Sequence, residues 1–240
     1  MTKNILLIAI ILLGVILITG CTSETPKEKI VVITGHQNWF PAMYSNNNGN
    51  ISGDAIEAAR NTFADINVKT ISLDVGPWDV AQEKARKGEV VIAALYKTKE
   101  REEYLYFSDP YMTDPIVGFV ATGNGLAYSK KEDFKGKRGV ATIGDSYGQE
   151  MDNYIVQANL SLIRVDTPEQ AFTLIKEGKA DYFLYSKSAG ERVIAESGLS
   201  GFEETAIISN QLFYIGVPKN SELAGRMEEI NRSLKKYSTL

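Results

Sequence analysis

Cysteine and histidine are the residue types that this sequence nearly lacks. Its 240 residues include one of each, Cys21 and His36. A single cysteine allows no internal disulfide, and one cysteine with one histidine does not provide a ligand set for zinc. The sequence also contains no carboxylate loop of EF-hand spacing and no Gly-x-x-x-x-Gly-Lys-Ser/Thr phosphate loop. We therefore expect no metal and no cofactor.

Long hydrophobic runs are equally scarce, and the exception is at the N-terminus. Residues 5–18 carry no charge or hydroxyl and follow Lys3. These fourteen residues are fewer than the roughly 20 that span a membrane, so they predict the core of a signal peptide, with a retained N-terminal anchor helix as the alternative. Ile18-Thr19-Gly20-Cys21 resembles the lipobox of prokaryotic lipoproteins. We expect a lipoprotein signal peptide over 1–20, acylation at Cys21, a tether over 21–28, and an extracytoplasmic protein that is lipid-anchored to the cell membrane.

The charge is mildly acidic and dispersed. The net charge is −4, and it becomes −5 when cleavage before Cys21 removes Lys3. A nucleic-acid partner would require a basic face, so we expect none. The composition, 44% hydrophobic and 23% charged, is typical of a globular domain. About 210 residues remain for folding, which suffices for one large domain or two lobes.

Strand-like and helix-like periods alternate along the chain. Helices are expected at 55–63, 79–87 and 222–237. Strands are expected at 30–34, 68–73, 90–95, 116–121, 139–143, 162–165, 182–185 and 213–217. Thr167-Pro168-Glu169-Gln170 supplies an N-cap, a proline at the first helical position and a capping box, so it predicts another helix. The alternation favours an α/β fold with parallel sheets.

Two segments share the order helix, glycine, strand. When Gly88 is placed on Gly178, Ala94-Leu95-Tyr96 falls opposite Leu184-Tyr185-Ser186. Both tripeptides lie at the carboxyl ends of predicted strands, where open α/β sheets hold ligands. The spacing favours two lobes that face one cleft, although helix–glycine–strand is also a common arrangement.

Four stretches carry a family resemblance: Trp39-Phe40-Pro41; Thr98 to Arg101 with Phe107-Ser108-Asp109-Pro110-Tyr111; Gly136 to Val140 leading to Gly144-Asp145-Ser146; and Gly178-Lys179-Ala180-Asp181. Together they resemble the polar amino-acid family, family 3, of type II periplasmic or extracellular solute-binding proteins of ABC transporters. The resemblance implies a two-lobed α/β fold with two connecting strands. Lobe 1 would comprise 29–113 plus 212–240, and lobe 2 would comprise 114–211. It also implies a monomer that binds a small-molecule ligand and docks on an ABC permease with its ATPase.

Arg101 is the expected ligand anchor. Its planar guanidinium matches a carboxylate with two parallel hydrogen bonds, and Thr98 can cap the short helix that carries it. Ser146 would reach the same carboxylate from the second lobe, and Trp39 offers a flat face for packing. The alternatives are an ion pair of Arg101 with Glu102, Glu103 or Asp109, and core packing of Trp39. Ala94, Tyr96 and Ser186, at the strand ends, complete the expected ligand-binding residues.

Three positions depart from the family pattern. Ser186 stands where amino-acid binders usually have an aspartate for the ligand's ammonium, Tyr96 where a small serine or threonine is usual, and Asp145 where threonine is usual. An ammonium buried in a cleft needs a counter-charge. Either Asp145 or another carboxylate supplies it, or the ligand has no α-ammonium, and the sequence favours the second option. We therefore expect a small anionic or zwitterionic, amino-acid-like solute, weak binding of common L-amino acids, and improved binding on Ser186→Asp.

Enzymatic alternatives have partial signals. The stretch from Gly144 to Gly148 matches the Gly-x-Ser-x-Gly nucleophile elbow, but His36 precedes Ser146, whereas hydrolases of this type place histidine last. Some relatives of the family resemble dehydratases that use a carboxylate in the cleft, for which this chain would have to use Glu57, Glu89 or Asp145. A ligand-sensing lipoprotein without a transport role is a further alternative. We expect a solute-binding protein for uptake, with no catalytic residues.

Overall fold

The computed structural model describes residues 30–46, 48–124 and 128–240. The expected signal peptide, tether and acylated Cys21 therefore lie outside the described residues. Within those three ranges, no helix combines the length and the apolar character needed to cross a membrane.

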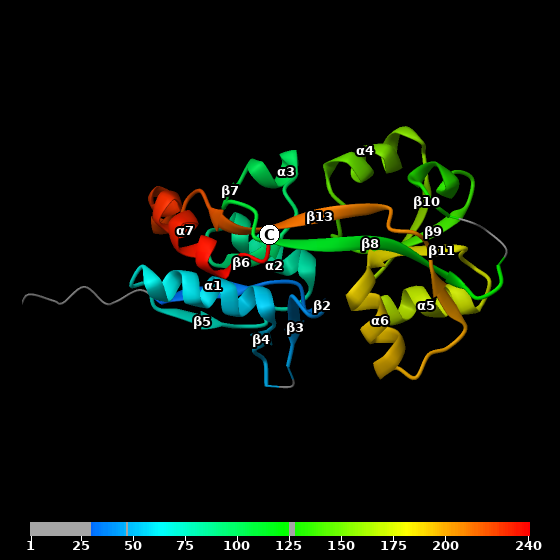
Figure 1. Ribbon diagram of the computed structural model, residues 1–240, viewed down its shortest axis with the longest axis horizontal. Coiled ribbons are helices and arrows are strands. Elements are labelled where there is room, and N and C mark those ends of the chain that lie inside the picture. The colour runs from blue at the N-terminus through cyan, green and yellow to red at the C-terminus, as the bar shows by residue number, and fades with distance from the viewer. Residues whose placement is uncertain (1–29, 47, 125–127) are drawn as a thin grey trace, which may run out of the picture.

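Two α/β lobes are joined by two long strands, β8 (Met112–Ala121) and β13 (Ser209–Pro218), which cross from one lobe to the other (Figure 1). The strands form one path in the order β10-β9-β11-β8-β13-β6-β1-β5, with β12 and β7 paired beside β8 and β13. β8 and β13 are antiparallel to each other, with Gln211 opposite Asp114. The predicted two-lobed α/β architecture with two connecting strands is confirmed.

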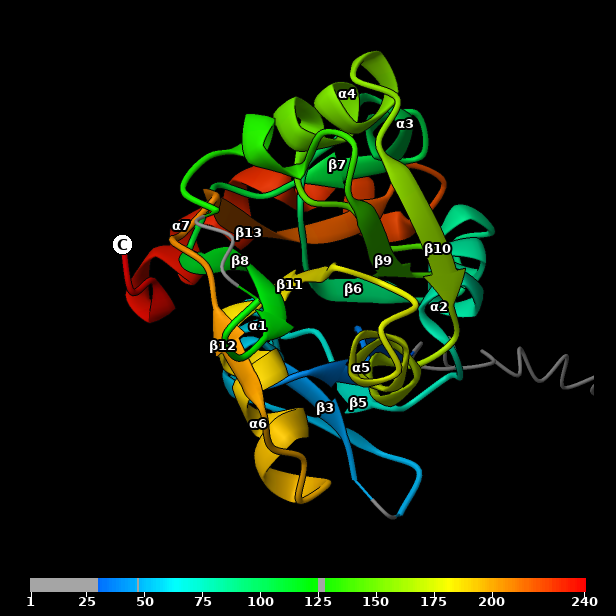
Figure 2. The ribbon, with the colours of Figure 1, turned by 90° about the vertical axis from the view of Figure 1, so that its right-hand side faces the viewer.

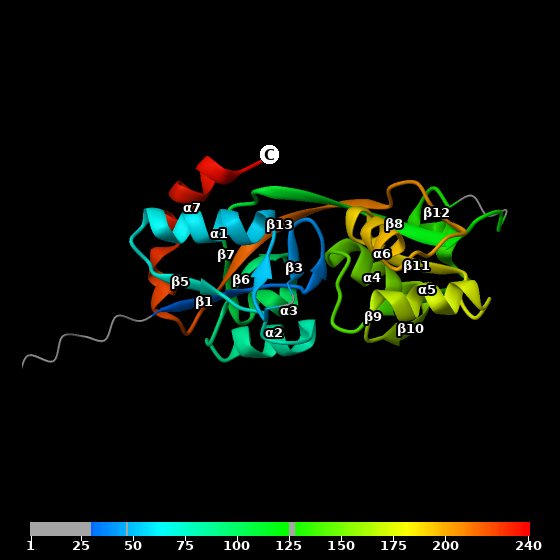
Figure 3. The same cartoon turned by 90° about the horizontal axis from the view of Figure 1, so that it is seen from below.

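The first lobe is built around the parallel strands β5, β1 and β6, in which Val32 is opposite Ile71 and Ile33 is opposite Val91. Its elements are β1 (Val31–Thr34), β2 (Asn38–Trp39), β3 (Met43–Ser45), β4 (Ile51–Ser52), α1 (Asp54–Asp65), β5 (Thr70–Ser72), α2 (Trp78–Arg86), β6 (Val91–Leu95), α3 (Lys99–Glu102), β7 (Leu105–Phe107) and α7 (Met227–Leu234). Figure 3 shows α1 and α7 on one side of these strands and α2 on the other. Both faces of the sheet are thus covered, as parallel strands require.

The second lobe has the same plan. Its elements are a 3-10 turn (Lys131–Phe134), β9 (Arg138–Thr142), α4 (Gln149–Gln157), β10 (Ser161–Val165), α5 (Pro168–Lys176), β11 (Tyr182–Ser186), α6 (Lys187–Glu196) and β12 (Phe202–Glu204). Figures 1 and 2 show α4 on one side of β9, β10 and β11, and α5 on the other. The predicted capping box of α5 is confirmed, because the Thr167 hydroxyl accepts from the Gln170 N–H while the Gln170 side chain accepts from the Thr167 N–H.

Two details differ from the expectation. The single helix predicted over 222–237 is divided into a 3-10 turn (Glu222–Arg226), α7 and a second 3-10 turn (Lys235–Tyr237). Gly225 has poor helix propensity, and short 3-10 segments commonly form at helix ends. The small sheet of β2, β3 and β4 was not predicted, because strands of two or three residues carry too few positions to show a period.

Candidate ligand-binding site

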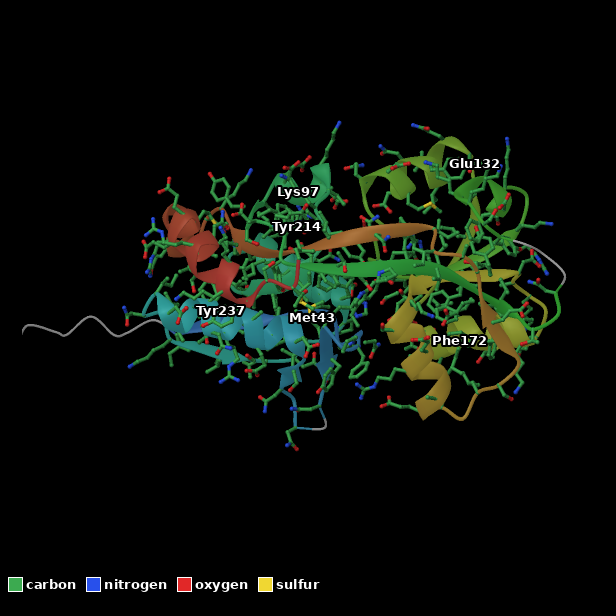
Figure 4. All side chains as sticks on the ribbon, in the orientation of Figure 1. Met43, Lys97, Glu132, Phe172, Tyr214 and Tyr237 are labelled. Carbon is green, nitrogen blue, oxygen red and sulfur yellow. The ribbon has the colours of Figure 1, made fainter. Side chains whose placement is uncertain are left out.

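A small cavity lies between the lobes, and side chains from both of them line it. It encloses about 20 Å³, room for about one water molecule. The lobes are in contact beside it, because the Gln82 side chain donates to the Gly144 carbonyl and the Tyr185 hydroxyl donates to the Asn38 carbonyl. A more open hollow of about 380 Å³, which Arg101 and Ser146 also line, lies between the lobes next to it. Its lining consists of His36, Trp39, Met43, Trp78, Ala94, Leu95, Tyr96, Arg101, Asp145, Ser146 and Phe213. Figure 4 shows Met43 on the side of its lobe that faces the second lobe, whereas Phe172 lies within the second lobe. Five of the six predicted ligand-binding residues line this cavity. Ser186 does not line it; its hydroxyl donates to Asp114, which also accepts from the lining residues Trp39 and Tyr96.

Arg101 is buried, and α3 positions it. The Thr98 hydroxyl caps α3 by accepting from the Arg101 N–H at 3.3 Å. The Arg101 guanidinium donates through Nε to Gln82 Oε1 at 3.1 Å and through Nη1 to the Tyr96 carbonyl at 2.9 Å. Both partners are neutral, and Arg101 forms no ion pair with a carboxylate in the described part of the chain. Among the described residues, Arg101 therefore does not form the surface ion pair that was considered as an alternative. Burial lowers the pKa of Arg101, yet a guanidinium stays charged.

The sequence analysis did not identify Asp114, the carboxylate at the start of β8. Only 5% of its surface is exposed. Its carboxylate accepts hydrogen bonds from Trp39 Nε1 at 2.5 Å, from Ser186 Oγ at 2.7 Å and from the Tyr96 hydroxyl. Burial raises the pKa of the Asp114 carboxyl, and the three hydrogen bonds act in the opposite direction. The sequence signal was an acid inside an otherwise apolar strand, because a buried acid requires partners.

The two similar segments noted in the sequence converge on this carboxylate. Tyr96 directly follows β6, and Ser186 ends β11. The Tyr96 hydroxyl binds one oxygen of Asp114, and the Ser186 hydroxyl binds the other. The carboxyl ends of equivalent strands in the two lobes therefore meet at one charged group on a connecting strand.

His36 and Asp145 join the lobes at the edge of the cavity. The Asn38 N–H donates to His36 Nδ1 at 3.0 Å, so the neutral ring carries its proton on Nε2. His36 Nε2 lies 3.2 Å from Asp145 Oδ1, and the Thr142 hydroxyl binds the other carboxylate oxygen. The Asp145 side chain is inaccessible to solvent. Asp145 does place a carboxylate beside the same cavity as Arg101, as expected, but both of its oxygens have partners.

The Ser146 hydroxyl is not paired with the histidine that a nucleophile elbow requires. Its hydroxyl donates to Asp152, which also accepts from the Tyr147 N–H at 2.8 Å. His36 Nε2 faces Asp145 instead of the serine.

Two of the three carboxylates considered for a dehydratase lie outside the cleft. Glu57 lies on α1, exposed and paired with Arg60, and Glu89 is paired with Lys84. Neither glutamate lines the interlobe cavity, so of the three proposed acids only Asp145 is at the site.

Two α/β lobes that are joined by two crossing strands and enclose a cavity between the lobes define the class of two-lobed periplasmic binding proteins. The family model of the bacterial extracellular solute-binding proteins, family 3, matches residues 31–240. The chain belongs to this family, which confirms the resemblance seen in the sequence.

Individual relatives share a low percentage of identical residues with this chain. The L-cystine-binding protein TcyJ of Escherichia coli (strain K12) is 27% identical over 166 residues, which are 68% of this chain and 61% of the relative. The chain thus spans less than two thirds of the length of that curated relative.

Solved structures share the fold at low sequence identity. The arginine-bound form of truncated ArgBP from T. maritima has a TM-score of 0.71 at 22% identity and covers 86% of this chain and 95% of its own. A histidine kinase sensor domain with similarity to periplasmic binding proteins has a TM-score of 0.75 at 19% identity, with coverage of 87% and 90%. An ABC uptake transporter substrate-binding protein from Streptococcus pneumoniae with bound histidine has a TM-score of 0.69 at 19% identity and covers 86% of each chain.

Proposed function

We propose that this protein is an extracytoplasmic solute-binding lipoprotein that captures a small, amino-acid-like solute bearing a carboxylate and presents it to an ABC permease. Family membership supports this function. So do the similar proteins, whose names describe binding of cystine, arginine or histidine. The lipid anchor at Cys21 is part of the proposal and rests on the lipobox. The protein acts by binding and release and has no catalytic step.

The buried guanidinium of Arg101 is the observation that carries the proposal. A buried cation without a carboxylate partner is costly, and an incoming carboxylate would relieve this cost. The Nε–H and one Nη1–H already have neutral acceptors, so the other Nη1–H and both Nη2–H groups remain for a solute. Ser146 of the second lobe lines the same cavity as Arg101. A carboxylate at Arg101 would therefore be enclosed by both lobes.

Closure of the lobes is the functional motion. The cavity of about 20 Å³ is smaller than any amino acid, so a solute enters with the lobes apart and the side chains shift to admit it. A solute that contacts both lobes stabilises the closed state relative to the open one. The permease would then distinguish the closed from the open protein.

The test uses the solute carried by the purified protein, identified by native mass spectrometry. Calorimetry would compare the unmodified protein with Arg101→Lys, because a point ammonium cannot reproduce the guanidinium fork. Loss of a charge-assisted hydrogen bond is worth about 1.5–3 kcal/mol, so affinity should fall about ten- to a hundredfold. Arg60→Lys, an exposed position on α1, is the control. Unchanged affinity in Arg101→Lys would remove Arg101 from the site.

A further inference from the structure

We infer that Gln82 is a positioning residue that holds the Arg101 guanidinium by its Nε–H and couples it to closure of the second lobe. This inference rests on the proposed function, because Gln82 acts through the residue that is proposed to bind the solute's carboxylate. It adds a further residue to the site, and it specifies which N–H groups of the guanidinium remain for the carboxylate.

The Gln82 side chain forms hydrogen bonds in both lobes. Its Oε1 accepts from the Arg101 Nε–H at 3.1 Å within the first lobe, and its Nε2 donates to the Gly144 carbonyl of the second lobe at 3.2 Å. A guanidinium can only donate, so Arg101 fixes the orientation of the amide, with Oε1 toward the guanidinium. The amide donor is then free of Arg101, and the Gly144 carbonyl accepts from it when the lobes meet.

Helix α2 places Gln82 beside a second residue that contacts Arg101. Trp78 and Gln82 are four residues apart on α2, so they lie on the same face of the helix, one turn from each other. The centroid of a Trp78 ring lies 5.5 Å from Arg101 Cζ, a distance at which an aromatic ring attracts a cation. One face of α2 therefore holds the guanidinium through an aromatic ring and an amide oxygen, and neither group neutralises its charge.

The second lobe approaches this face of α2 through a glycine. Gly144 has a φ of +79°, a conformation that favours glycine. A Cβ on Gly144 would lie 3.2 Å from Gln82 Nε2 and 3.4 Å from Trp78 Cδ1, so a side chain at position 144 would crowd α2. Asp145 and Ser146, which follow Gly144 directly, line the interlobe cavity. The hydrogen bond from Gln82 therefore fixes the loop that brings Ser146 to the site.

Closure then depends on how a carboxylate contacts Arg101. The bond between Gln82 and Arg101 lies within one lobe and persists when the lobes separate, whereas the bond between Gln82 and Gly144 forms only on closure. A carboxylate that binds the Nη groups leaves Gln82 in place. A carboxylate that takes the Nε–H displaces Oε1, and the amide loses the orientation that its bond to Gly144 requires. We therefore expect the closed state to favour a carboxylate that is bound at the Nη groups.

The experiment compares three variants with the unmodified protein, each freed of carried solute by dialysis in denaturant and refolding. Gln82→Met removes both hydrogen bonds and keeps the length of the side chain. Gln82→Glu keeps an acceptor for Arg101 and removes the donor for Gly144. Gln149→Met is the matched control. Gln149 lines the same hollow and also joins the lobes, because its Oε1 accepts from the Lys99 N–H at 2.8 Å, but it forms no hydrogen bond with Arg101 in the described part of the chain.

Two measurements separate a positioning role from a purely structural one. The first is hydrogen exchange of the Arg101 Nε–H, followed by 1H–15N NMR and assigned by its absence in Arg101→Lys. Exchange should be at least about tenfold faster in Gln82→Met and stay slow in Gln82→Glu and Gln149→Met. The second is closure, measured by small-angle X-ray scattering, and the ratio of closed to open protein should fall about two- to tenfold in all three variants.

Three results would overturn the inference. Exchange that is unchanged in Gln82→Met would show that Gln82 does not hold the Nε–H. Exchange that is equally accelerated in Gln149→Met would show that opening of the lobes, not loss of the Gln82 amide, exposes Arg101. Closure that is unchanged in Gln82→Glu would show that the donor to Gly144 does not join the lobes.

A titration with acetate separates this inference from the proposed function. In the unmodified protein, acetate should shift the Nη signals of Arg101 more than the Nε–H signal, and in Gln82→Met it should shift both; a larger shift of the Nε–H in the unmodified protein would refute the inferred mode of binding. If acetate shifts the Nη signals but Gln82→Met changes neither exchange nor closure, carboxylate capture is supported and the role of Gln82 is refuted. If Gln82→Met acts as expected but acetate shifts no Arg101 signal, carboxylate capture is refuted and the positioning of Arg101 by Gln82 is supported.

Discussion

Tyr185→Phe should shift the protein toward its open state, because the Tyr185 hydroxyl forms one of the few hydrogen bonds that hold the lobes together. Tyr185 lies on β11 of the second lobe and is fully buried. Its hydroxyl donates to the Asn38 carbonyl of the first lobe at 2.7 Å. When the lobes separate, water can replace this donor. The substitution therefore raises the free energy of the closed state and leaves that of the open state nearly unchanged.

The magnitude follows from the burial of this contact. An average hydrogen bond contributes about 0.5–1.5 kcal/mol net, and a buried acceptor left without its donor costs about 1–3 kcal/mol. A change of about 1–3 kcal/mol lowers the ratio of closed to open protein about 5- to 150-fold. Apparent solute affinity falls by no more than this factor, since only the closing step is affected.

Closure is measured by small-angle X-ray scattering and by tryptophan fluorescence. Both tryptophans of the chain, Trp39 and Trp78, line the interlobe cavity, so their emission reports whether the cleft is exposed to water. Tyr147→Phe is the matched control. Tyr147 is equally buried in the same lobe, but its hydroxyl has no hydrogen-bond partner among the described residues. If both variants give the same scattering and emission, the Tyr185 hydroxyl does not hold the lobes closed.

Two further predictions concern the anchor and the second lobe. Cys21→Ser should abolish acylation and release the protein from membranes; a variant that still sediments with membranes after salt washing would contradict the lipid anchor. Thr167→Ala should lower the free energy of unfolding by about 1 kcal/mol in urea denaturation, because it removes the N-cap of α5. Thr173→Ala, exposed on the same helix, is its control, and an equal loss in both would show that the cap is not the cause.

The architecture could be predicted from the sequence because its signals are local. The capping box at Thr167 marks the start of α5 within four residues, and the apolar run over 90–95 identifies a buried strand by itself. Arg101 was identified because the stretch from Thr98 to Arg101 resembles the family pattern and a guanidinium matches a carboxylate. The sheet of β2, β3 and β4 has no comparable signal, because its strands of two or three residues are too short to show a period.

Asp114 could not be found in this way, because its partners come from three separate parts of the chain. Trp39 is 75 residues from it, Ser186 is 72 residues from it, and Tyr96 is 18 residues from it. Taken alone, two of these residues suggest other roles: Trp39 suggests a packing surface, and Ser186 suggests that a counter-charge is missing. Only the fold shows that the charge absent at position 186 is present one hydrogen bond away.

The two lobes contribute different kinds of side chains to the site, and we expect these to have different functions. Arg101 belongs to the first lobe, and Asp114 lies on a connecting strand beside Trp39 and Tyr96 of that lobe. If Arg101 holds the carboxylate of a solute, the first lobe provides this electrostatic contact before closure. The second lobe contributes neutral hydroxyls, from Ser146 and Tyr185, and a histidine-bound carboxylate, Asp145. Changes in the first lobe would then alter which solute binds. Changes in the second lobe would alter how far the equilibrium favours closure, whatever the solute.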